Sequence, residues 1–81
     1  MFVIGDKVKV ANVFDHDLLY YGFVDDIVDG VAIVKVAKQR FRNERLKDYS
    51  SFLSLPYKMY ELRALSHDDK LELAGNELVK L

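Results

Sequence analysis

The sequence predicts a single, mainly β domain in which five short strands curl into a small barrel. Three observations lead to this prediction. Apolar and polar residues alternate near the N-terminus in "KVKV", which is the period of a half-buried strand. Two apolar runs flank one Asp-Gly pair in "GFVDDIVDGVAIVKV", which is a hairpin signal. The 81 residues are 51% hydrophobic and 31% charged, which is enough for one core and argues against disorder.

The first strand is expected over residues 7–13, because β-branched valines suit a pleated, half-buried surface. The polar stretch "FDHDLL" then predicts a turn, and the second strand is expected over residues 20–28. Val24 and Ile27 lie three residues apart in that strand, with two aspartates between them. A β-bulge is predicted there, since one extra residue puts both apolar side chains on the same face.

Asp29 and Gly30 predict a two-residue hairpin turn, because a type I′ turn needs positive φ at both central residues. The third strand is expected over residues 31–37, with Ala32, Val34 and Val36 pointing inward.

The stretch "KQRFRNERLKDYSS" has no β pattern and is interpreted as a long loop with one helical turn around residues 43–47. A short strand over residues 52–55 should end at Pro56, which cannot donate to a ladder. A 3₁₀ turn over residues 57–60 and a last strand over residues 61–65 complete the barrel. The predicted core consists of Val8, Val10, Val24, Ile27, Val34, Val36 and Leu62.

Residues 66–81 form a C-terminal extension, expected to pack on a barrel made by residues 1–65, and they allow two interpretations. Ser66 with Asp69 resembles a capping box, which would start a helix. Gly75-Asn76 lies between "KLELA" and "ELVKL", which is typical of a type II′ hairpin turn and unfavourable inside a helix. The hairpin is the favoured prediction and the helix its alternative.

Three stretches between Ile4 and Leu65 resemble the SH3-like small barrels, including KOW-type and Tudor-like domains and related small bacterial or phage barrels. "IGDKVKV" resembles their first strand, "GFVDDIVDGVAIVKV" their central hairpin, and "LPYKMYELRAL" their 3₁₀ turn and last strand. The resemblance implies a five-stranded barrel that acts as a non-catalytic interaction module. It does not choose a partner, because this fold carries many functions.

Catalysis is not expected from this chain, and no catalytic residue is assigned. It has two histidines, no threonine, no cysteine and no Gly-x-Ser-x-Gly sequence, so a nucleophile–base pair has no recognisable context. Asp15, His16 and Asp17, with the aspartates at 25, 26 and 29, match no calcium-loop spacing and are interpreted as a solvated acidic rim. No metal, cofactor or small-molecule substrate is therefore expected.

Charge is segregated along the chain and suggests two kinds of partner. Residues 35–47 contain six basic residues and one glutamate, so this segment carries +5 and the rest of the chain −6, for the total of −1. If the partner is a nucleic acid, phosphate contact and base stacking are assigned to Lys38, Arg40, Phe41, Arg42, Arg45 and Lys47. Protein contact is assigned to Tyr20, Tyr21, Asp25 and Asp26. Binding to another protein or to a second copy is favoured, with RNA or DNA binding as the alternative, because the overall pI is only about 6.1.

A cytoplasmic location without membrane contact is expected. The N-terminal "MFVIGDKVKV" has a four-residue apolar run with no basic residue before it, which does not resemble a signal peptide. No apolar run approaches the roughly 20 residues that span a bilayer.

Overall fold

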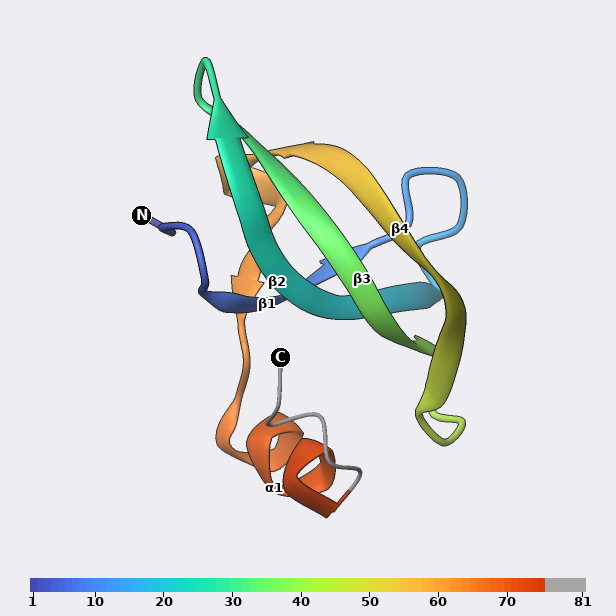
Figure 1. The fold of residues 1–81 in the computed structure, drawn as a ribbon. Coiled ribbons are helices and arrows are strands. Elements are labelled where there is room, and N and C mark those ends of the chain that lie inside the picture. The colour runs from blue at the N-terminus through green and yellow to red at the C-terminus, as the bar shows by residue number, and fades with distance from the viewer. Residues whose placement is uncertain (76–81) are drawn as a thin grey trace.

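The computed structural model describes residues 1–75, apart from the side chains of residues 50–52 and 74–75, and shows a curled antiparallel sheet (Figure 1). Its five strands lie in the order β4-β3-β2-β1-β5. They are β1 (Lys7–Ala11), β2 (Leu18–Val28), β3 (Val31–Phe41), β4 (Lys47–Lys58) and β5 (Arg63–Ala64), with a 3₁₀ turn at Met59–Glu61 and helix α1 at His67–Gly75. The mainly β prediction is confirmed. The edge strands β4 and β5 are not paired with each other in the described chain, so the sheet is curled but open.

The two-residue turn between β2 and β3 forms as predicted. Asp29 has φ 51° and Gly30 has φ 77°, which is the pair of positive values that a type I′ turn requires. Val28 pairs with Val31 across the turn, which sets the register of the hairpin up to the first bulge.

Two irregularities bend the β2–β3 hairpin. Asp25 is the extra residue of the predicted bulge, since Val24 pairs with Val34 and Asp26 with Ile33. A second shift leaves Ala37 unpaired, because Tyr21 pairs with Lys38 and Gly22 with Val36. Figure 1 shows the resulting curvature of β2 and β3.

The predicted core lies inside the curl of the sheet. Val8, Val24, Val34 and Val36 are fully buried, and Val10 and Leu62 are nearly so. Ala32, Tyr20 and Tyr57 join the same cluster, and the predicted core residue Ile27 packs against it while staying partly exposed. The inward face assigned to the third strand is therefore confirmed.

The predicted loop over residues 38–51 is wrong, because β3 continues to Phe41 and β4 begins at Lys47. The bulge after Val36 shifts the alternation of inward and outward side chains by one residue. Residues 38–41 of β3 therefore do not continue the apolar pattern of residues 31–37. Lys38 and Gln39 then pair with Asp48 and Lys47. Residues 42–46 form a turn without helix, and Arg42 has φ 54°.

Smaller boundary errors have local causes. β1 ends at Ala11 rather than at residue 13, because the Asn12 side chain accepts hydrogen bonds from the N–H groups of Phe14 and Asp15 and turns the chain. Pro56 does not end β4, since β4 is an edge strand, where proline is tolerated. The 3₁₀ turn forms two residues later than expected, and β5 is limited to two residues.

The hairpin prediction for residues 66–81 is wrong in its described part, because residues 67–75 form helix α1. Ser66 Oγ accepts a hydrogen bond from Asp69 N at 3.1 Å, and Asp69 Oδ2 accepts one from Ser66 N at 2.9 Å. This reciprocal capping box satisfies two of the donors at the start of the helix. Gly75 is the last described residue of α1, and Asn76 lies outside the described residues.

Helix α1 covers the outer face of the sheet, opposite the main core (Figure 1). Leu73 packs there with Tyr21 and Leu46 in a second buried cluster, and Leu19, Ala37 and Leu65 surround it. The side chain of Lys9, between the inward Val8 and Val10, lies on the same outer face and meets Asp69. The sheet therefore has a core on one face and a helix on the other.

Candidate functional site

The basic residues assigned to nucleic-acid contact are spread over two strands and a turn. Lys38, Arg40 and Phe41 belong to β3, Lys47 begins β4, and Arg42 and Arg45 lie in the turn between them. They therefore do not form one loop around a shared ligand.

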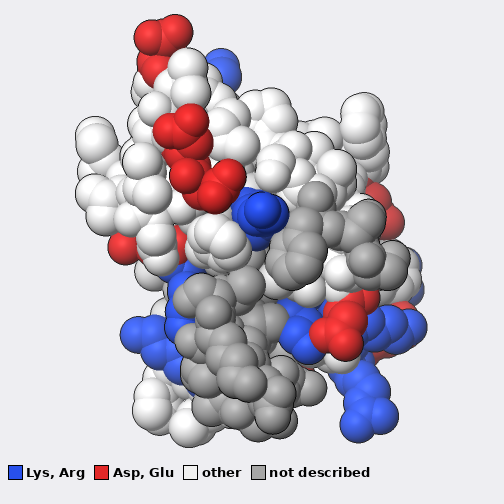
Figure 2. All heavy atoms as spheres, viewed as in Figure 1, with Lys and Arg blue, Asp and Glu red and all other residues white. Residues whose placement is uncertain are grey.

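Acidic side chains neutralise most of these cations. Lys38 pairs with Asp48, Arg40 with Glu72, Arg42 with Asp17 at 3.3 Å, and Lys47 lies 4.0 Å from Glu44. In Figure 2 acidic side chains lie among the Lys and Arg side chains near α1. Of the six residues, Arg45 is exposed and makes no ion pair within the described chain. A phosphate would therefore have to displace existing carboxylates from most of these side chains.

Phe41 is only marginally available for stacking. Its exposed fraction is 36%, and the Arg42 guanidinium lies 5.0 Å from its ring centre. A base could reach the ring only at the edge that Arg42 leaves open.

The residues assigned to protein contact divide into a buried and an exposed pair. Tyr20 belongs to the main core and Tyr21 to the cluster under α1, with exposed fractions of 5% and 2%. The Tyr20 ring packs edge-on against Tyr49, with ring centres 5.6 Å apart. Asp25 and Asp26 are exposed near the tip of the β2–β3 hairpin. Only the aspartates are therefore at the surface in this conformation.

The aspartates of the sequence do not gather into one site. Asp15 and Asp17 precede β2, while Asp25, Asp26 and Asp29 lie at its other end. Within residues 1–75, no three His, Asp or Glu side chains meet as metal ligands would.

Exposed apolar side chains gather instead around the β1–β2 loop, residues 12–17. The exposed fraction is 96% for Phe14 and 55% for Val13, and it is 72% for Tyr60 of the 3₁₀ turn. We call this area the Phe14 surface. It also includes the adjoining β4 residues Leu55 and Pro56, which share a hollow with the loop.

Two hollows lie on either side of Val13. One, of about 280 Å³, separates the loop from β4 and is lined by uncharged side chains that include Phe14, Tyr20, Leu55 and Tyr57. The other, of about 260 Å³, separates the loop from the 3₁₀ turn and carries the polar residues His16, Glu61 and Arg63. The Phe14 surface thus combines an apolar hollow with a more polar one, as binding surfaces for peptides commonly do.

Hydrogen bonds hold the β1–β2 loop in place. Asn12 Oδ1 accepts from Phe14 N at 2.7 Å and from Asp15 N at 3.0 Å, while Asn12 Nδ2 donates to the Tyr20 hydroxyl at 2.8 Å. At the other end, Arg42 N donates to Asp17 O at 2.7 Å. The Phe14 ring is therefore presented by a braced loop.

Tyr57 in the floor of the apolar hollow has a raised pKa. Burial raises the pKa of Tyr57 to about 12, and the neighbouring Tyr20 and Glu61 contribute in the same direction. A phenol that ionises so reluctantly offers a neutral hydroxyl at all physiological pH values. The described lining of this hollow contains no charged side chain.

The outer edge of β4 is poorly suited to adding another strand beside this hollow. Pro56 has no N–H, and the N–H of Lys58 donates to Glu61 Oε2 at 2.8 Å. A partner would therefore be held here mainly by side-chain contacts.

A larger hollow of about 480 Å³ lies between the N-terminal segment, β5 and α1. Asp6, Lys7 and Lys70 line it together with apolar residues. The mixed charges and the open shape give it no arrangement that points to a ligand.

The sequence analysis assigns no binding role to Val13, Phe14 or Tyr60. It extends the first strand to Val13 and gives Phe14 no role in the turn that follows. The sequence contains a signal for the exposure of Phe14. The ring lies between the turn-forming residues Asn12 and Asp15, and a turn directs it away from the core.

Comparison with protein-family models, with curated proteins and with solved structures finds no significant match for this chain. Within residues 1–75, no helix is both long enough and apolar enough to cross a membrane.

Proposed function

We propose that this chain is a non-catalytic interaction module that binds another protein, or a second copy of itself, through the Phe14 surface. We further propose that its curled sheet is an SH3-like small barrel. The order of the strands, the bulges in the β2–β3 hairpin and the 3₁₀ turn before the last short strand support this assignment. A cytoplasmic location is part of the same proposal.

The observation that carries the proposal is the position of Phe14. A nearly fully exposed phenylalanine on a braced loop, beside an apolar hollow, leaves apolar area in water that a partner can cover. Complete burial of one such ring contributes about 1.5–3 kcal/mol. Because the loop is already ordered, binding would lose little of that gain to loop ordering.

Nucleic-acid binding through residues 35–47 is the weaker alternative. Electrostatic affinity for nucleic acid comes from cations that release counterions from phosphates. Lys38, Arg40 and Arg42 already have carboxylate partners, so each phosphate contact would first have to break an ion pair.

Site-specific photo-crosslinking in the native host tests the proposal. A benzophenone amino acid is placed at position 14 in one variant and at position 28 in the other. Val28 is the matched control, because it is 50% exposed at the far end of β2, away from the Phe14 surface. We expect a discrete crosslinked protein band, or a crosslinked dimer of the chain, from position 14 and none from position 28.

Mass spectrometry of the band distinguishes a second copy from another protein. Equal crosslinking from both positions, or no discrete adduct from position 14, would contradict binding through the Phe14 surface.

A further inference from the structure

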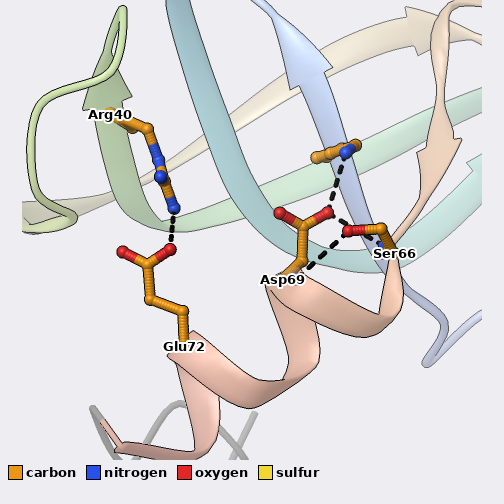
Figure 3. A network of polar contacts seen from close by, with 5 residues as sticks. Arg40, Ser66, Asp69 and Glu72 are labelled. Atoms are coloured by element: carbon orange, nitrogen blue, oxygen red, sulfur yellow. Dashed lines mark hydrogen bonds and ion pairs between the residues drawn. The ribbon is translucent and has the colours of Figure 1, made fainter.

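Two ion pairs join the described part of helix α1 to the sheet (Figure 3). Asp69 Oδ2 pairs with Lys9 Nζ at 2.7 Å, and Glu72 pairs with Arg40. Leu73 is the member of the described helix that enters the buried apolar cluster, while Leu71 is 61% exposed. The docking of α1 thus rests on two ion pairs and one leucine within the described residues.

The described part of α1, His67–Gly75, contacts the sheet through Leu73 and two carboxylates. Most of the stability of a helix in a protein comes from such packing rather than from local propensity. The folding of α1 therefore depends on its contacts with the sheet, and another helix that made better contacts could replace it.

One hydrogen-bond donor of the sheet, in the side chain that pairs with Glu72, has no partner within the described residues. Glu72 engages Nη2 of Arg40, but the buried Nε of Arg40 has no hydrogen-bond partner within the described chain. Arginine often binds a carboxylate with two parallel hydrogen bonds, and a buried donor left unpaired is unfavourable. A carboxylate placed to accept from both nitrogens would fit this position better than Glu72 does.

We infer that the surface beneath α1, formed by Lys9, Tyr21, Arg40 and Leu46, is a docking site for an acidic amphipathic helix of another protein, with α1 as its tethered competitor. Such a helix would carry two acidic residues three positions apart, facing Lys9 and Arg40, and an apolar residue directly after the second. This is the pattern by which Asp69, Glu72 and Leu73 occupy the surface.

A protein helix fits this surface better than a nucleic acid does. Leu19, Leu46 and Leu65 surround Tyr21 with aliphatic side chains, which favour an apolar helix face over a phosphate backbone. The inference is independent of the Phe14 surface, which lies on another part of the fold.

The probe is a fluorescent synthetic peptide with the sequence of residues 66–81, titrated with the full chain and followed by anisotropy. Leu73→Ala in the full chain weakens docking of the tethered helix, and Leu71→Ala is the matched control at an exposed position of the same helix. The tethered helix competes at an effective concentration in the millimolar range, so we expect the Leu73→Ala chain to bind at least about tenfold tighter than the wild type or Leu71→Ala. Adding Arg40→Gln to Leu73→Ala should reverse that gain.

Equal affinity of the peptide for all three chains would overturn the inference, as would no binding to the Leu73→Ala chain up to about 1 mM. An unchanged affinity after Arg40→Gln would also overturn it. Displacement of the peptide by a single-stranded oligonucleotide, but not by excess unlabelled peptide, would assign the surface to nucleic acid instead. If Leu73→Ala does not fold, Glu72→Gln replaces it with Asp68→Asn as its control, and the expected direction is the same.

Discussion

Gly22 occupies the closest approach between β2 and β3. A Cβ atom at this position would lie 1.9 Å from the carbonyl oxygen of Lys35, which is backbone and cannot rotate away. The glycine sits where the second register shift bends the hairpin, so the curvature of the sheet depends on the missing side chain.

We predict that Gly22→Ala lowers the free energy of unfolding by about 3 kcal/mol, because the added methyl group forces the two strands apart. Gly30→Ala is the control: Gly30 has φ 77° but nothing within 4 Å of an added Cβ, so only the left-handed penalty of about 1 kcal/mol applies. Urea denaturation of both variants measures the difference. Equal stability of the two variants would show that the strands do not meet as closely as described.

Single residues were predictable where one physical rule applied alone. Val8 and Val10 alternate with lysines, so their burial follows from the period of a strand. Lys35 between Val34 and Val36 indicates the inward face of the third strand in the same way. Tyr20 and Tyr21 were harder to assign, since adjacent strand residues face opposite sides and both faces of this sheet turn out to be covered. Sequence alone cannot show that a helix will cover the second face.

At the scale of elements, the largest errors came from contacts distant in sequence. Residues 38–51 show no strand pattern, yet pairing of Lys38 with Asp48 and burial of Leu46 under α1 hold them in a hairpin. For residues 66–75 the capping box and the docking of Leu73 prevailed over the turn signal of Gly75-Asn76. Both outcomes depend on packing partners that local propensity does not include.

The capping residue Asp69 makes the stability of α1 dependent on pH. Burial alone would raise the pKa of its carboxyl group, but hydrogen bonds from Lys9 and Ser66 outweigh that effect and lower the pKa below its usual value. The folded state therefore binds this proton less readily than the unfolded state does. The contribution of Asp69 to stability is present above the unfolded pKa, about 3.9, and is lost as the pH falls through the folded value.

We predict that Asp69→Asn lowers the free energy of unfolding by about 1 kcal/mol at pH 7, through loss of the carboxylate in the capping box and the ion pair. The difference from the wild type should shrink as the pH falls below the unfolded pKa of about 3.9, because protonation of Asp69 removes the charge that the ion pair needs. Urea denaturation at several pH values measures this, with the exposed neighbour Asp68→Asn as control. A destabilisation of equal size at pH 2 and pH 7 would show that the charge of Asp69 is not what matters.

At the scale of the whole molecule, several cations of residues 35–47 link different elements of the fold through ion pairs. Lys38, Arg40 and Arg42 form ion pairs with carboxylates of three other elements. The partners are Asp48 of β4, Glu72 of α1 and Asp17 of the β1–β2 loop. These pairs join elements that are distant in sequence. Phe14 is among the most exposed large apolar side chains of the described chain and lies beside an apolar hollow, which is why we propose a protein partner there.

We propose that the basic residues 35–47 stabilise the fold and that a protein partner binds the Phe14 surface. The most direct test is to titrate a mixed-sequence single-stranded oligonucleotide with the protein at several salt concentrations. Fluorescence anisotropy reports the binding. We predict no binding at about 50 mM salt up to about 100 μM protein. Two results together would contradict the claim. The first is binding with a slope of log K against log salt near −3, as four phosphate contacts would give. The second is a loss of about 1 to 1.5 from that slope when Arg42 and Arg45 are both replaced by alanine.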